Sequence, residues 1–338
     1  MNPHIAMNRR SLCQHLLACA AAPLAAIAPL TAFAQGTAGY PARPITLVVG
    51  YPAGGDSDVL ARFLGEKLSA RLGQPVVVDN RTGAAGTIAV NYVSKAPPDG
   101  YTLLLAPNTL AITPHVLQTS RTAQVDPATD LTPIIQLASQ SLFVVVASDT
   151  GVKTMKELLA SVKAGRIRSY ASPGYGSPMH ILAELVDKSA GVKITQVPYR
   201  GSMPAIADMV AGQVPMMYTS LGPVAPYIDS GKLTVLAVAD AQRSPFLPQV
   251  PTLAEAGVPH AEIGAWQALL GPKGLPPALV ALLNQHFNEI IRMPDVVARM
   301  KSISLQPEGG PPDRMKKLAE DDYLRYGRLV KEFGIRAE

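Results

Sequence analysis

The chain alternates short apolar runs with longer amphipathic stretches. In its first third, short apolar runs predict strands at 45–50, 76–78 and 101–105. Between them, stretches with apolar residues on one helical face predict helices at about 57–72 and 87–95. Repeated strand–helix–strand units predict an α/β fold with a parallel, helix-covered sheet.

The same alternation returns further along the chain. It predicts strands at 143–146 and 169–171 and helices at about 154–163 and 178–189. Proline is favoured in the first turn of a helix, and prolines at 276–277, 294 and 311–312 stand where three more helices can begin. We therefore predict C-terminal helices at about 276–292, 294–301 and 311–333.

A glycine turn joins the first predicted strand to the first predicted helix. It reads Y-P-A-G-G-D-S-D from Tyr51 to Asp58. Gly54 and Gly55 allow a tight turn and a close ligand approach, and Ser57 or Asp58 can cap the helix. Unpaired N–H groups at such a helix start can hold a carboxylate or phosphate. Glycine needed only for the turn is the alternative interpretation.

A second loop, Ser172 to Ser177, also joins a predicted strand to a predicted helix. Open parallel sheets bind ligands beyond the carboxyl ends of their strands, where both loops fall. We therefore expect a cleft between two lobes. Gly174-x-Gly176 is followed by Met179 where a dinucleotide fingerprint needs a third glycine, which disfavours a nicotinamide enzyme.

The N-terminal segment predicts export. Arg9 and Arg10 precede an apolar run that carries no acid and ends in Ala32-Phe33-Ala34. This pattern is typical of a secretory signal peptide cleaved between Ala34 and Gln35, which places the mature protein in the periplasm. A lipid-anchored form cleaved before Cys19 is the alternative.

Composition and charge narrow the function further. Both cysteines lie in the predicted leader, and 48 % hydrophobic with 16 % charged residues fits a well-buried chain of two domains. The formal net charge is +5, and loss of Arg9 and Arg10 leaves +3. Because no dense Lys/Arg block occurs, a nucleic-acid partner is disfavoured.

Catalytic signatures are absent from the sequence. It contains no G-x-x-x-x-G-K-[ST], G-x-S-x-G or H-E-x-x-H motif. We expect no catalytic residue, no metal site and no cofactor. The alternative is a secreted α/β hydrolase that uses Ser177 and His180 with Asp56 or Asp58, although the usual nucleophile motif is missing. His180 can equally be a helix histidine satisfied by a neighbour.

Six separated blocks resemble a known family. In order they are Y-P-A-R-P-I-T-L-V-V at 40–49, G-Q-P-V-V-V-D-N-R at 73–81, P-D-G-Y-T-L-L-L at 98–105, V-P-Y-R-G-S at 197–202, G-K-L-T-V-L-A-V at 231–238 and P-Q-V-P-T-L-A-E-A-G at 248–257. From about Tyr40 to Ile335 the chain resembles the extracytoplasmic solute receptors of tripartite tricarboxylate transporters, the Bug (Bordetella uptake gene) family.

The resemblance implies a two-lobed type II periplasmic binding protein fold with a ligand cleft between the lobes. We expect a signal peptide at 1–34, lobe 1 in 35–138 and 242–338, and lobe 2 in 139–241, with the C-terminal helices packed on lobe 1. Two crossings between the lobes would form a hinge.

The resemblance also implies a function and partners. It predicts a monomer that captures a small carboxylate-bearing or related polar molecule and delivers it to membrane permease subunits, without changing a covalent bond. A ligand sensor that acts on a signalling partner is the alternative.

The resemblance also implies ligand contacts from both lobes. Backbone N–H groups and hydroxyls can hold an anion without a buried lysine or arginine. Arg81 and Arg200 could assist, but they are interpreted as solvated surface residues. The predicted ligand-binding residues are Tyr51, Ala53, Gly54, Gly55, Asp56, Asp58, Asn108, Thr109, Ser172, Gly174, Tyr175, Gly176, Ser177, His180, Gly201, Ser202, Thr219 and Ser220.

Two of these positions depart from the usual family pattern. Asp56 stands where a small or neutral residue is common, and Thr219 where the family often has aspartate. A second acid beside Asp58 would repel a bare dianion, so we hypothesise that Asp56 favours a ligand with a cationic or hydrogen-donating group. Tyr175 could add an aromatic surface for a flat ligand, whereas Trp266 is expected to pack at the lobe junction.

Overall fold

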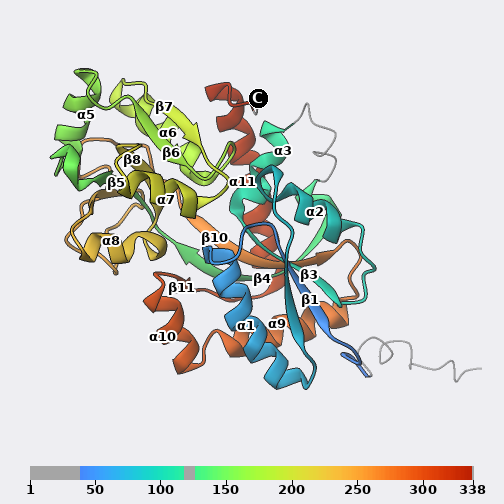
Figure 1. The fold of residues 1–338 in the computed structure, drawn as a ribbon. Coiled ribbons are helices and arrows are strands. Elements are labelled where there is room, and N and C mark those ends of the chain that lie inside the picture. Colours follow the sequence, from blue (N-terminus) through green and yellow to red (C-terminus); the bar gives the residue numbers. More distant parts are fainter. Residues whose placement is uncertain (1–38, 118–125, 337–338) are drawn as a thin grey trace, which may run out of the picture. The chain divides into compact units, whose positions relative to one another are not determined.

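A computed structural model describes residues 39–117 and 126–336 of the protein. These residues form an α/β structure built around two β-sheets (Figure 1). The predicted signal peptide and both cysteines lie outside the described residues. In the described part of the chain, the helices and strands predicted from the apolar pattern are confirmed, with ends that differ by a residue or two.

The first sheet has six strands in the order β11-β4-β10-β3-β1-β2. They are β1 (Ile45–Val49), β2 (Val76–Asn80), β3 (Thr102–Pro107), β4 (Leu131–Gln140), β10 (Ala265–Pro272) and β11 (Gln306–Pro307). Strands β1, β2 and β3 are parallel, as predicted. Strand β10 is antiparallel to both β3 and β4, so the complete sheet is mixed. The reason is that β10 follows the second sheet along the chain and re-enters the first sheet in the opposite direction.

The second sheet has five strands in the order β7-β6-β8-β5-β9. They are β5 (Leu142–Ala147), β6 (Ser169–Ser172), β7 (Thr195–Pro198), β8 (Met216–Ser220) and β9 (Leu233–Val238). Strand β6 is parallel to β7 and β8, whereas β5 is antiparallel to β8 and β9. The two sheets divide the strands between two lobes, and the exact lobe boundaries at 138/139 and 241/242 stay a prediction.

Helices cover both faces of the first sheet. Successive strand residues point to opposite sides, so an apolar strand has side chains to bury on each face. Leu103 and Leu105 of β3 pack in one buried cluster with α1 (Asp56–Leu72) and α9 (Pro277–Ile290). Leu104 and Ala106 pack in another with α2 (Thr87–Ser94) and α11 (Pro312–Phe333). The other helices are α3 (Thr113–Val116), α4 (Pro127–Asp130), α5 (Met155–Lys163), α6 (Pro178–Ala190), α7 (Ser202–Val210), α8 (Ala225–Asp229) and α10 (Pro294–Ser302).

The C-terminal helices pack on the first sheet, as expected, and α11 also reaches the second lobe. Helices α9 and α11 both contact β4, and α11 further contacts α6. An ion pair between Lys188 of α6 and Glu332 of α11 joins the two helices. Among the described residues, no helix is both long enough and apolar enough to cross a membrane.

Replacing Phe287 by alanine tests whether α9 belongs to the core of the first lobe. Phe287 is fully buried, so Phe287→Ala should lower the free energy of unfolding by about 3–5 kcal/mol in urea titrations. Leu324 of α11 is 61 % exposed, and the control Leu324→Ala should change it by less than about 0.5 kcal/mol. Equal effects of the two substitutions would contradict the packing of α9.

Candidate ligand-binding site

The interlobe cavity lies where the carboxyl ends of β1 and β3 meet the segments that follow β6, β7 and β8. Its volume is about 100 Å³, which is room for several water molecules or a small organic molecule. The residues that line it are Tyr51, Pro52, Ala53, Gly55, Asp56, Ser57, Ala85, Pro107, Asn108, Thr109, Gln140, Pro173, Ser177, Pro178, Met179, Arg200, Gly201, Ser202, Met203, Pro204, Pro223, Ala265 and Gln267.

A buried carboxylate fixes the first glycine turn. Asp58 is 2 % exposed and accepts hydrogen bonds from Gly54 N–H at 2.9 Å, Arg62 Nε at 3.0 Å and Asn80 Nδ2 at 2.9 Å. Asn80 also donates to the Tyr51 carbonyl at 3.0 Å. Burial raises the pKa of Asp58, but the hydrogen bonds from Arg62, Gly54 and Asn80 outweigh it, so the pKa lies below its usual value. The carboxylate is therefore ionised, and its oxygens accept hydrogen bonds from groups of the protein.

The start of α1 differs from the prediction that Ser57 or Asp58 caps it. Gly55 is the N-cap residue, and no side chain caps the helix. The Ser57 hydroxyl donates instead to Gln267 Oε1 at 2.9 Å, and Asp58 turns back to Gly54. The first N–H groups of a helix have no partner within it, so the start of α1 favours negative charge at the cavity wall.

Asp56 connects the two lobes. Its Oδ2 accepts a 2.6 Å hydrogen bond from the hydroxyl of Ser220, at the end of β8. Burial raises the pKa of Asp56, and the hydrogen bond from Ser220 offsets this only in part. Among the described residues, no lysine or arginine forms an ion pair with Asp56.

Two amide side chains beside the cavity carry buried oxygens without a hydrogen-bond partner. Asn108 is fully buried and donates through Nδ2 to the Gly264 carbonyl and the Tyr326 hydroxyl, both at 3.1 Å. In the described structure neither Asn108 Oδ1 nor Gln140 Oε1 has a hydrogen-bond partner. Buried polar atoms are normally paired, so these two oxygens are exceptions within the described structure.

The second loop is held mainly by its own hydrogen bonds. The Ser177 hydroxyl donates to the Gly174 carbonyl at 2.9 Å and accepts from His180 N–H at 3.2 Å, which caps α6. Ser172 Oγ accepts from Gln196 Nε2 at 2.6 Å. Gly174 has φ of +128°, a conformation that favours glycine. Of the predicted contacts in this loop, only Ser177 lines the cavity.

His180 is a buried structural histidine in this arrangement. It is 5 % exposed, its Nδ1 accepts from Gly176 N–H at 3.4 Å, and its Nε2 lies 3.8 Å from Glu184. Burial first, and then the charge of Lys193, lower the pKa of His180 to about 4. Because the Ser177 hydroxyl donates to Gly174 and not to His180, the serine–histidine pair of the hydrolase alternative is not formed.

The predicted contacts thus fall into two groups. Those that line the cavity are Tyr51, Ala53, Gly55, Asp56, Asn108, Thr109, Ser177, Gly201 and Ser202. Those outside its lining are Gly54, Asp58, Ser172, Gly174, Tyr175, Gly176, His180, Thr219 and Ser220. Their role as ligand contacts stays a prediction, and several of the second group support the loops that carry the first.

The cavity also has wall residues that the sequence interpretation missed. Gln140 and Gln267 stand on β4 and β10, whose long-range pairing the local pattern does not reveal. Arg200 is exposed as expected, yet it lines the cavity, and no described residue forms an ion pair or hydrogen bond with it. Arg81 pairs with Asp79 at 2.7 Å and stays outside the wall.

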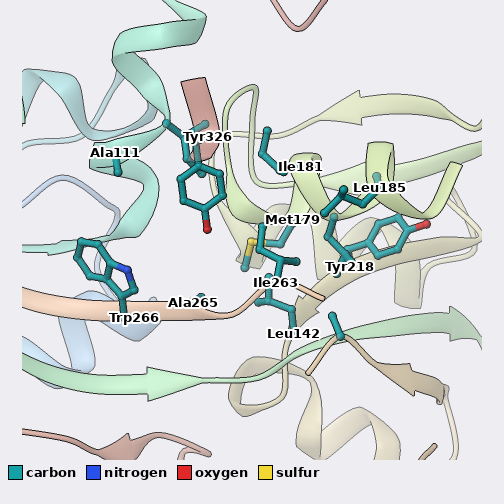
Figure 2. Packing of buried hydrophobic residues seen from close by; sticks show 14 of the residues in the cluster. Ala111, Leu142, Met179, Ile181, Leu185, Tyr218, Ile263, Ala265, Trp266 and Tyr326 are labelled. Carbon is teal, nitrogen blue, oxygen red and sulfur yellow. The ribbon is translucent and has the colours of Figure 1, made fainter. Parts of the chain in front are cut away.

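Trp266 packs in the core, as expected. It is 4 % exposed and donates through Nε1 to Asp322 of α11 at 2.7 Å. Figure 2 shows it near Ala111 and Tyr326, in a buried cluster that continues to Leu142 and Tyr218 of the second sheet. Within residues 39–117 and 126–336, no group of three histidine, cysteine, aspartate or glutamate side chains could hold a metal ion.

The two sheets and the cavity between them define a two-lobed periplasmic binding protein. The family model described as "Tripartite tricarboxylate transporter family receptor" matches residues 60–335, and the chain belongs to this family. It is 35 % identical over 301 residues to Protein BugT of Bordetella pertussis, covering 88 % of this chain and 91 % of BugT.

Solved structures agree with this assignment. A structure titled "R. palustris Rpa4515 with adipate" is 35 % identical, with a TM-score of 0.83 over 88 % of this chain and 99 % of that one. MatC from Rhodopseudomonas palustris with bound malate is 29 % identical, with a TM-score of 0.78 over 86 % of this chain and 100 % of that one. The family is one of solute-binding receptors and not a class of enzymes.

The low pKa of His180 predicts a pH-dependent stability. Above about pH 6.5 the histidine is neutral in both states, so its contribution is fully present there. As the pH falls from 6.5 towards 4, the unfolded state takes up a proton first and the folded state loses stability. Between pH 7.5 and 4.5 the wild type should lose roughly 2 kcal/mol more than His180→Gln in urea unfolding.

The comparison with the variant is needed because Asp187 acts in the opposite direction. Burial raises the pKa of Asp187 to about 6, so this group stabilises the fold as the pH falls. Glu184, Lys193 and the Tyr175 ring, which face His180, are the same in both proteins. Parallel pH profiles for the two proteins would contradict a buried neutral His180.

Proposed function

We propose that this receptor captures a small carboxylate-bearing metabolite in the interlobe cavity and delivers it to the permease subunits of a tripartite transporter. One observation carries the proposal: two helices without side-chain caps, α1 and α7, both begin at the cavity, beside an arginine without an ion pair. Gly55 and Gly201 are the N-cap residues, and Arg200 directly precedes Gly201. Helix starts and a free guanidinium both attract carboxylates.

The ligands of relatives support the same class. Two structures related to this chain carry adipate and malate, which are both carboxylates. In this chain the predicted contacts Thr109, of the first lobe, and Ser202, of the second, add hydroxyls to the cavity lining. The ligand would be held by backbone and hydroxyl groups around Arg200 and released without chemical change.

The proposal includes export and a partner. The leader at 1–34, cleaved between Ala34 and Gln35, would place the receptor in the periplasm, where it would act as a monomer without cofactor or nucleic acid. Closure of the two lobes would present a surface formed by both of them to the permease. In the alternative, a signalling protein instead of the permease would recognise the same closed form, and the receptor would act as a sensor.

Ligand-dependent thermal unfolding tests the proposal on the chain from Gln35 onward. The probes are adipate, malate, citrate, aspartate, glutamate and 4-aminobenzoate. At 100 times its dissociation constant a ligand adds about 2.7 kcal/mol, which should raise the unfolding midpoint by several degrees. Recovery of the probe unchanged would support a receptor, whereas its turnover would favour an enzyme.

A blocking variant locates the site. Ala53 lines the cavity and is exposed, so Ala53→Trp should fill the cavity and abolish the ligand-induced shift. Ala298 of α10 is exposed and lies outside the cavity lining, so the matched variant Ala298→Trp should keep the shift. Equal shifts in both variants would place the ligand somewhere else.

A further inference from the structure

The carboxylate of Asp56 is only half satisfied by the protein. Its Oδ2 accepts from the Ser220 hydroxyl, and no described residue donates to Oδ1. Asp56 lines the interlobe cavity at the first position of α1. An ionised carboxylate can only accept hydrogen bonds, and removal from water is costly unless donors replace the water.

Arg62, an arginine of the same helix, already has partners of its own. Arg62, one turn and a half further along α1, pairs with Asp58 at 2.9 Å and also donates to Asn80. Neither Arg62 nor any other lysine or arginine in the described part of the chain forms an ion pair with Asp56. The missing donor at Asp56 must therefore come from water or from a ligand.

Other acceptors on the same wall show the same lack of donors. The orientation of the Asn108 amide is fixed, because its Nδ2 donates to the Gly264 carbonyl, which can only accept. Its Oδ1 is left without a partner, as is Gln140 Oε1. Asp56, Asn108 and Gln140 all line the cavity, but the two amide oxygens are covered by the protein, whereas Asp56 is only half-buried and can be reached by a ligand.

The opposite wall carries a cation. Arg200 has no counter-ion, and it directly precedes Gly201, the N-cap residue of α7, and Ser202, its first residue, which also line the cavity. A ligand carboxylate is best placed there. A second ligand carboxylate near Asp56 would meet a like charge in a partly desolvated site, where repulsion is strong.

We infer that Asp56 is a specificity-determining residue that accepts a hydrogen bond from a nitrogen of the ligand, so that the receptor selects carboxylates that also carry an ammonium or N–H group. This inference rests on the proposed function. Ser220 donates to one oxygen of the Asp56 carboxylate, and the other oxygen is left for the ligand. Burial also raises the pKa of Asp56, and a bound ammonium would lower it again.

Matched ligand pairs that differ by one amino group test the inference by isothermal titration calorimetry. The pairs are succinate and aspartate, glutarate and glutamate, and benzoate and 4-aminobenzoate. The wild type should bind the amino member of at least one pair about tenfold more tightly or better, since a charge-assisted hydrogen bond contributes about that much. Asp56→Asn keeps an oxygen for Ser220 and should reduce this ratio to near one.

A control variant separates the two partners of the hydrogen bond. Ser220→Ala removes the hydroxyl but not the carboxylate, so it should retain the preference for the amino member. An unchanged ratio in Asp56→Asn, or tighter binding of the member without the amino group by the wild type, would overturn the inference and leave the proposed function standing. A wild type that binds adipate, malate or citrate but none of the six compounds would also overturn the inference, whereas no binding of any of these nine carboxylates would contradict the proposed function itself.

Discussion

The hydrogen bonds to the Asp58 carboxylate are the constraint on which the first-lobe side of the cavity depends. They join the glycine turn, the end of β2 and the second turn of α1 through Gly54, Asn80 and Arg62. Removing one partner of such a buried charge is costly, because the carboxylate then stays buried with fewer compensating donors. These hydrogen bonds fix the conformation of the loop from Tyr51 to Gly55, so that the start of α1 faces the cavity.

Two carboxylates two residues apart therefore have opposite roles. Positions separated by two residues do not share a helix face, so Asp58 turns to its own lobe and Asp56 turns to the cavity. Hydrogen bonds lower the pKa of Asp58, whereas burial raises that of Asp56. Asp58 therefore stabilises the glycine turn, whereas Asp56 is available to discriminate between ligands.

Much of the fold could be predicted because its signals are local. The periodicity of α1 and the glycine turn before it lie within a short stretch of chain, and the family blocks recur in order. The return of β10, the hydrogen bond between Ser57 and Gln267, and the cavity position of Arg200 depend on contacts between distant segments. The hydrogen bonds of Asp58 with Asn80 and of His180 with Gly176 are local in space, but the sequence alone does not reveal them, and the role of both residues as ligand contacts stays a prediction.

A crystal structure of the protein with a bound amino-bearing carboxylate would test these roles most directly. Electron density for the ligand should lie between the two lobes, with its carboxylate at Arg200 and its nitrogen within hydrogen-bonding distance of Asp56. The bonds from Gly54 and Asn80 to Asp58 should be unchanged. A ligand bound outside the cavity, or one held by Asp58 with Asp56 turned away, would contradict these roles.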